Sequence, residues 1–234
     1  KLRVVLRLWF FVVVSIALGI TINFIVLKGG FKSLFIASVI SIVLALILSY
    51  IKTYKRNFLV HNLTELGIYP GIAAIFVPIL NIYTVIALLF LISVYDMWAV
   101  WKSKIMQKMA KYQIKQLNIF SGFFLPYLGK KEREEIKKLK LKYKNSKNLN
   151  QKMRGKRVKV NLAILGGGDV VFPIIAAGVF LKFSGLAHAL LVILGAFLGL
   201  SYLFFLAEKK KFYPAMPFIT IGIFIGAILG YLII

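Results

Sequence analysis

The chain of 234 residues has no cysteine and very few acidic residues. The absence of cysteine excludes disulfides, thiolate zinc sites and cysteine nucleophiles. Only seven residues are acidic, against 31 lysines and arginines, which gives a formal net charge of +24. The two histidines, His61 in a predicted loop and His188 near the outer end of a predicted span, are far apart, and we expect no metal site and no cofactor.

Hydrophobic residues make up 60% of the chain, more than a soluble domain of this length can bury in one core. A helix needs about 20 apolar residues to cross a bilayer core. Seven runs approach or meet this length, which predicts an all-α, polytopic bundle of transmembrane helices. The predicted spans are Val4 to Leu27, Leu34 to Ile51, Leu66 to Leu80, Tyr83 to Trp101, Leu162 to Leu181, Leu186 to Ala207, and Tyr213 to Ile234.

These spans divide the chain into four predicted regions. N-terminal spans occupy residues 1–65, two further spans occupy 66–101, a basic loop occupies 102–160, and three C-terminal spans occupy 161–234. Lysines alternate with apolar residues from Lys104 to Leu128, which predicts a helix on the membrane surface. Glycines spaced by four residues in the last two spans, Gly195 and Gly199 and then Gly222, Gly226 and Gly230, predict close helix packing.

The basic residues predict how the chain is oriented in the membrane. Nineteen of them lie between Lys102 and Lys159, in a loop without a nucleic-acid recognition motif, so we expect contact with the lipid bilayer and none with nucleic acid. If that loop is cytoplasmic and the spans alternate, the inside carries 28 Lys and Arg and the outside three. Basic residues are retained on the cytoplasmic side. We therefore expect a multi-pass protein of the cell membrane, with loop 102–160 cytoplasmic and the C-terminus outside.

The positions of the acidic residues point to the chemistry. Every Glu, including Glu65, is expected in a loop or at the edge of a span, whereas both aspartates, Asp96 and Asp169, lie inside predicted spans. A charged side chain there costs at least about 2.5 to 3.5 kcal/mol, so it is a functional candidate by default. At about 1.5 Å per residue, both aspartates lie roughly 8 to 11 Å below the cytoplasmic face. Two adjacent carboxyls in a low dielectric share one proton, as in aspartic proteases.

Three short motifs accompany the aspartates. Tyr95 precedes Asp96; Gly166, Gly167 and Gly168 precede Asp169; and Pro214, Ala215 and Met216 open the last span. Their order, with a long basic loop between the first two, resembles the presenilin and signal peptide peptidase family of GxGD intramembrane aspartyl proteases, most closely an archaeal presenilin homologue. The resemblance implies a presenilin-like helical fold, normally of nine spans, and an aspartic endopeptidase that cleaves transmembrane protein substrates. It also implies that the three motifs form the active site and contact the substrate.

The sequence departs from this family at three points. Seven spans are visible, Met216 replaces the usual Leu of the Pro-Ala-Leu motif, and the variable position of the Gly-x-Gly-Asp motif is Gly167. The predicted orientation matches presenilin, which favours type I substrates. Two alternatives stay open: a prepilin-peptidase-like protease, and a cation channel or transporter that uses the aspartates as ion sites. The sequence does not indicate an oligomeric state.

Overall fold

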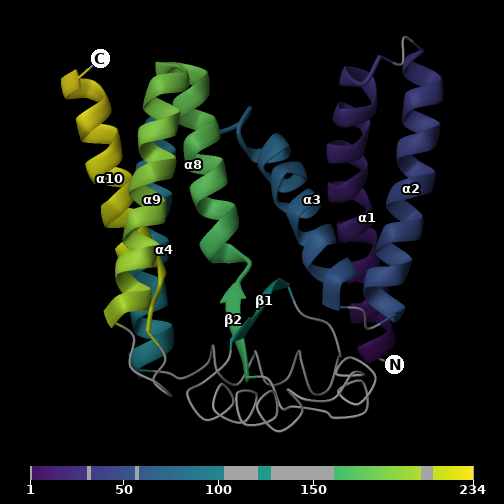
Figure 1. Cartoon of the computed structure of the whole chain (residues 1–234), viewed down its shortest axis with the longest axis horizontal. Helices are drawn as coiled ribbons and strands as arrows, with labels where there is room; N and C mark the ends of the chain where they lie inside the picture. The colour runs from purple at the N-terminus through teal and green to yellow at the C-terminus, as the bar shows by residue number, and fades with distance from the viewer. Residues whose placement is uncertain are drawn as a thin grey trace, which may run out of the picture. The chain divides into compact units, whose positions relative to one another are not determined.

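The computed structural model describes residues 2–30, 33–55, 58–102, 121–127, 161–206 and 213–233. In these ranges the chain forms seven α-helices, one π-helix and two strands (Figure 1). They are α1 (Leu2–Lys28), α2 (Leu34–Tyr54), α3 (Phe58–Phe76), α4 (Ile82–Met97), η1 (Trp98–Lys102), β1 (Gly122–Tyr127), β2 (Asn161–Gly166), α8 (Gly168–Ser184), α9 (Leu186–Leu206) and α10 (Met216–Ile233). Two compact units result: Lys1–Gly122 with Gly166–Ile234, and Phe123–Leu165.

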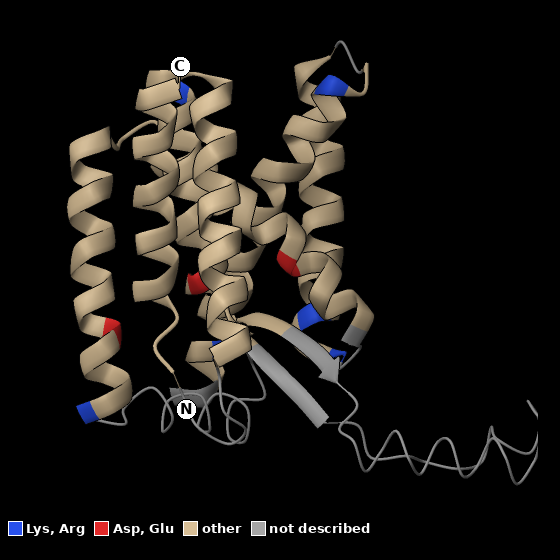
Figure 2. Cartoon of the chain, turned by 60° about the vertical axis from the view of Figure 1, so that its left-hand side comes forward, with Lys and Arg blue, Asp and Glu red and all other residues tan. Residues whose placement is uncertain are grey.

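The helices of the first unit form a polytopic membrane bundle, as the hydrophobic runs predict. Within the described ranges, five helical stretches are long and apolar enough to cross a bilayer. They are Val4–Lys28, Leu34–Tyr54, Ile82–Lys102, Leu186–Leu206 and Met216–Ile233. The described Lys and Arg lie near the helix ends, so the long middle of each helix carries almost no charge (Figure 2).

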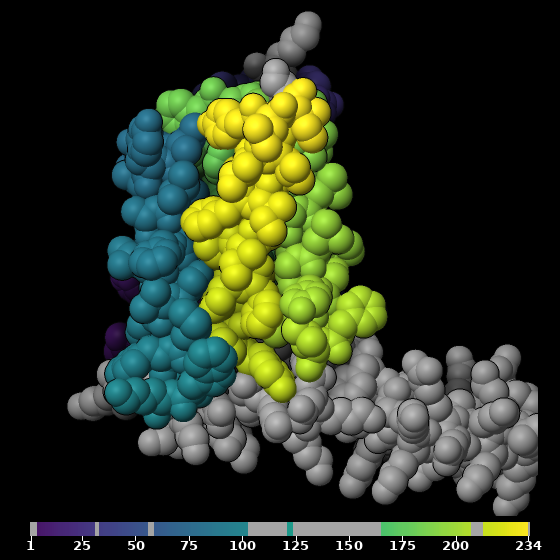
Figure 3. Space-filling model, turned by 90° about the vertical axis from the view of Figure 1, so that its left-hand side faces the viewer, coloured from purple at the N-terminus to yellow at the C-terminus, as the bar shows by residue number. Residues whose placement is uncertain are grey.

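The first unit contains two groups of packed helices. α1 packs against α2 and α3, while α4, α8, α9 and α10 surround the main buried core; α3 also contacts α8. Leu89 of α4, Phe180 of α8 and Ile223 of α10 are fully buried in this core. One face of the bundle shows α10 lying between α4 and α9 (Figure 3). This arrangement brings the start of α10 to the end of α4.

The predicted glycine contacts between the last two spans are confirmed. A Cβ atom added to Gly195 would lie 2.0 Å from the carbonyl oxygen of Gly222, and one added to Gly222 would lie 2.1 Å from that of Gly195. Only a residue without a side chain permits two helix backbones to approach this closely. The glycines thus set the distance between α9 and α10.

The third span differs from its prediction at both ends. α3 begins at Phe58, eight residues before the predicted Leu66, and ends at Phe76. A residue that precedes proline disfavours helical backbone, so Pro78 explains why the helix stops before Leu80. The earlier start puts His61 and Glu65 inside α3, although we expected a loop for the first and a span edge for the second.

Two further expectations about helix are wrong. Residues Leu162–Gly166, predicted as the start of a span, form β2, which pairs with β1 in a two-stranded sheet. The predicted surface helix from Lys104 to Leu128 lies mostly outside the described residues, but its part at Gly122–Tyr127 is strand β1. Phe, Leu and Ile suit strands, and a short apolar run does not distinguish strand from helix. Consequently the depth of Asp169 does not follow from helical rise after Leu162.

Candidate active site

Asp96 lies in the last turn of α4 and meets the start of α10. Its side chain is buried, with 7% of the residue exposed, and its Oδ2 accepts a hydrogen bond from the backbone N–H of Met216 at 3.1 Å. The backbone of Ala215 also donates to this carboxyl group, and Pro214 just before it is fully buried. The first and third motifs of the sequence therefore meet in space.

The backbone changes its helical form directly after Asp96. α4 ends at Met97 and continues as the π-helix η1, in which Ala99 and Val100 are buried. Single turns of π-helix are rare and occur often at functional sites. The side chain of Tyr95, by contrast, is 59% exposed and its ring lies 6.3 Å from that of Trp98. Tyr95 thus points to the outside of the bundle.

Asp169 lies in the first turn of α8, directly after the three glycines. Its carboxyl interacts electrostatically with Asp96, so the two aspartates are near one another, and it accepts from the backbone of Gly166. A carboxylate in the first turn of a helix is also stabilised by the helix dipole. Asp96 and Asp169 are therefore far apart in the sequence and close enough in the structure to interact electrostatically.

Each glycine of the second motif has a different neighbour. A Cβ on Gly166 would lie 3.1 Å from Oδ2 of Asp169. One on Gly167 would lie 2.9 Å from the hydroxyl of Ser121 and 3.2 Å from that of Tyr69, whereas one on Gly168 would meet only the Phe172 ring at 3.5 Å. The first two glycines are therefore packing positions, and the third has ordinary room.

An apolar cavity of about 300 Å³ borders Asp169. Pro173 and Ala177 of α8 line it on one side, and Ile193 and Phe197 of α9 line it on the other. Such a lining suits apolar side chains, and Asp169 is the ionisable group at its edge. Among the described residues, no three His, Asp or Glu side chains gather in a way that could hold a metal ion.

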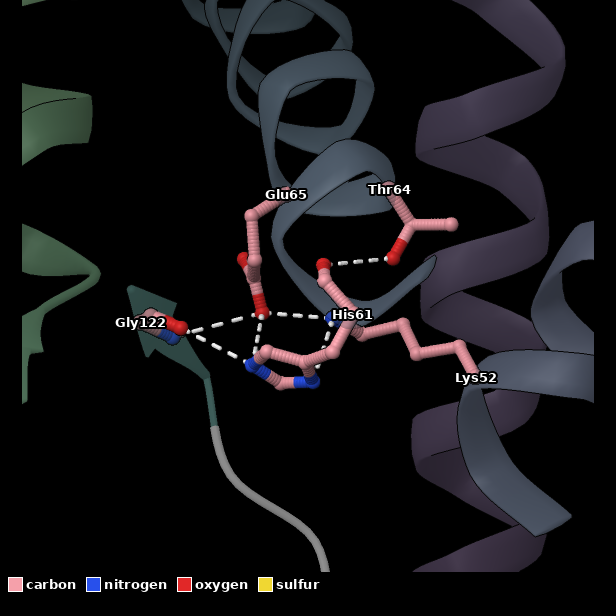
Figure 4. A network of polar contacts seen from close by, with 5 residues as sticks. All are labelled: Lys52, His61, Thr64, Glu65 and Gly122. Atoms are coloured by element: carbon pink, nitrogen blue, oxygen red, sulfur yellow. Dashed lines mark hydrogen bonds and ion pairs between the residues drawn. The ribbon is translucent and has the colours of Figure 1, made fainter. Parts of the chain in front are cut away.

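A second polar cluster, which was not predicted from the sequence, lies near this site. Lys52 of α2 forms an ion pair with Glu65 of α3, and His61 lies one turn before Glu65. All three contact Gly122 or one another (Figure 4). His61, Glu65 and Tyr69 follow one another at intervals of four residues, which places them on one face of a helix. This spacing is the signal in the sequence that could have indicated the cluster, if the helix had been predicted to begin before His61.

The comparisons with known proteins identify the family of the chain. No curated protein matches the chain. The family described as signal-peptide peptidase, presenilin aspartyl protease matches it over residues 1–234. Since this match covers the full chain, the protein belongs to the signal-peptide peptidase and presenilin family of aspartyl proteases.

Proposed function

We propose that the protein hydrolyses peptide bonds within transmembrane segments of other membrane proteins, with Asp96 and Asp169 as its catalytic pair. The observation that carries this proposal is the meeting of all three motifs: the Asp96 carboxyl interacts with Asp169 and accepts from the N–H of Met216. Both aspartates are rare ionisable groups on membrane helices, where such groups are costly unless they serve a function.

The pair would work by sharing one proton. The ionised carboxyl takes a proton from a water molecule, whose oxygen attacks the peptide carbonyl, while the protonated carboxyl donates to the leaving amide nitrogen. The water becomes part of the new carboxyl group, and the pair ends with its single proton again. This chemistry requires no nucleophilic side chain.

The substrate must offer an extended backbone to this pair. A helix hides its carbonyl groups in its own hydrogen bonds, so the substrate unwinds locally before attack. The segment Tyr213–Ala215 precedes α10 without helical structure, beside Asp96, and is a suitable partner for such an unwound strand. The predicted cytoplasmic loop favours type I membrane proteins as substrates.

Cleavage of a single-span substrate by three variants tests the catalytic pair. We expect Asp96→Asn and Asp169→Asn each to abolish cleavage and to leave the fold nearly intact, because an amide keeps the volume but cannot exchange the proton. The matched control is Ser93→Ala, which removes a buried hydrogen bond of 2.7 Å to Thr220 at the same α4–α10 contact. Such bonds contribute about 0.6 kcal/mol in membranes, so this variant should stay active.

Comparing the two Asn variants with Ser93→Ala distinguishes a loss of carboxyl chemistry from a general disturbance of the bundle. Cleavage by either Asn variant would contradict the catalytic pair. Equal loss in Ser93→Ala would assign the effect to the helix contact instead of the carboxyl chemistry.

A further inference from the structure

A buried ion pair joins α2 to α3. The Nζ of Lys52 lies 2.5 Å from Oε1 of Glu65, and the two side chains are 1% and 0% exposed. Removing two charges from water is expensive, and the pair recovers this cost only when its remaining hydrogen bonds are satisfied. A buried ion pair is thus weak evidence for stability, and its other contacts must explain what it does.

Those contacts converge on the backbone of Gly122. Oε1 of Glu65 accepts from the N–H of Gly122 at 3.3 Å, and Nε2 of His61 lies 2.9 Å from the carbonyl oxygen of Gly122 (Figure 4). Both backbone polar groups of this one residue are therefore bonded to side chains of α3. Gly122 is buried and has φ +144°, a conformation that favours glycine. The chain is held here by its backbone and not by a side chain.

The hydrogen bonds also define the state of His61. A carbonyl oxygen only accepts, so Nε2 carries the proton, and Nδ1 at 3.5 Å from Nζ of Lys52 faces a group that only donates. The ring is therefore neutral. Neutral His61 and charged Glu65 hold Gly122 from two sides.

The residue before Gly122 reaches the second motif. The hydroxyl of Ser121 would lie 2.9 Å from a Cβ on Gly167, two residues before Asp169. Tyr69, one turn after Glu65 on the same face of α3, interacts with both Glu65 and Ser121 and packs on Gly167. One face of α3 thus connects the ion pair, through Ser121 and Gly122, with the turn that carries Asp169.

We propose that Lys52, His61 and Glu65 are positioning residues, which hold Ser121 and Gly122 against Gly167 and thereby fix the turn that presents Asp169. This inference rests on the proposed function, in which Asp169 is catalytic. Their contacts with Gly122 act on Asp169 through the backbone between Gly167 and Asp169. A displacement of about 1 Å at a reacting group can lower the rate 10²-fold.

Two double variants separate positioning from stability. Lys52→Met with Glu65→Gln and Lys52→Met with Glu65→Leu each remove both charges together, so neither leaves a buried charge unpaired. They differ at the group that faces Gly122: Gln keeps an oxygen that accepts from the N–H of Gly122, and Leu has no polar atom there. Because the two are similar in size, a purely structural role predicts equal cleavage by both.

For cleavage of a single-span substrate, we expect kcat of the Leu double variant to be about tenfold below that of the Gln double variant, with KM within about twofold. Equal kcat values in the two folded proteins would overturn the proposal. If the Leu double variant does not fold, His61→Phe takes its place, since it removes the ring N–H that donates to Gly122, together with the Nδ1 that faces Lys52. Unchanged kcat in His61→Phe would then overturn it.

A disulfide measures the position of Ser121 independently of catalysis. The chain has no native cysteine, and Ser121→Cys with Gly167→Cys places a sulfur about 3 Å from the opposite Cβ, as a disulfide requires. We expect this disulfide to form in the otherwise unchanged protein, and its yield to be at least about threefold lower in the Leu double variant. The control pair, Ser121→Cys with Ser184→Cys at the far end of α8, should form no disulfide. An unchanged yield would overturn the positioning role. Failure of the catalytic pair would leave this yield untouched, so the two hypotheses are distinguishable.

Discussion

The carboxyl of Asp169 lies close to the backbone of Gly166, a residue that has no side chain. Gly166 lies where a Cβ would approach Oδ2 of Asp169 to 3.1 Å, closer than most Cβ contacts. Asp96 is held similarly by backbone, because the N–H of Met216 and not its side chain donates to the carboxyl. At the scale of single residues, the site is arranged by the backbone around two carboxyl groups.

Gly166→Ala tests the backbone contact at Asp169. The added methyl group would push the Asp169 carboxyl away from its present position, and we expect kcat for a single-span substrate to fall about tenfold or more. Gly168→Ala is the matched control, because its methyl group would meet only the Phe172 ring at an ordinary 3.5 Å. Equal activity of the two variants would show that the carboxyl can move without loss.

The two aspartates could be predicted from sequence, while the cluster around Glu65 could not. Asp96 and Asp169 stand out because each is an isolated charge within an apolar run, and the cost of such a charge is independent of the detailed fold. Glu65 appeared to lie outside the membrane because polar residues His61, Asn62 and Thr64 precede it. Only the packing of α3 against α1, α2 and α8 buries this part of the helix.

α9 and α10 make a close contact between backbones, and so do α1 and α3, where a Cβ added to Gly71 would lie 2.0 Å from the carbonyl oxygen of Ala17. Gly199 and Gly226 add to the pair of Gly195 and Gly222, since an added Cβ on either would lie 2.3 Å from a backbone oxygen of the other helix. α10 in turn presents its first N–H group to Asp96. The glycine contact is therefore connected to the candidate active site through a single helix.

Gly222→Ala should weaken this helix pair. The new Cβ would lie 2.1 Å from a carbonyl oxygen that cannot rotate away, and overpacking of this kind costs about 1–3 kcal/mol. We expect a lower unfolding temperature in detergent, together with reduced cleavage. The matched control is Gly19→Ala in α1, whose added Cβ would have Ala45 as its neighbour at 3.8 Å. Similar melting of both variants would mean that α10 is free to shift.

The elements that sequence predicts best are those governed by the bilayer alone. α9 runs from Leu186 to Leu206, within one residue of its predicted end, because twenty apolar residues in lipid have to be helical. β1, β2 and η1 were missed for a common reason. β1 and β2 satisfy their backbone groups by pairing with each other, and η1 departs from the α-helical bond pattern; no apolar periodicity in the sequence indicates either.

The predicted alternation of the spans implies an uneven charge distribution of the whole molecule along the membrane normal. α1 begins and α10 ends at opposite ends of the bundle (Figure 1), as an odd number of spans requires. Under this alternation, 28 basic residues belong to the side of the N-terminus and of loop 102–160, and three belong to the other side. Translocation of so many basic residues is disfavoured, which gives the bundle one preferred orientation.

Labelling of single cysteines in intact cells tests this orientation, on which the preference for type I substrates depends. Ser146→Cys lies in the basic loop and Lys32→Cys lies between the first two spans, so a membrane-impermeant maleimide should label the second and not the first. Both should react after the cells are opened, which controls for access to each thiol. The absence of native cysteine makes every signal specific to the introduced residue. Labelling of Ser146→Cys from outside, with Lys32→Cys protected, would show that the bundle has the opposite orientation, because the orientation of one span fixes that of all the others. The catalytic pair would then act from the same helices on substrates of the opposite orientation.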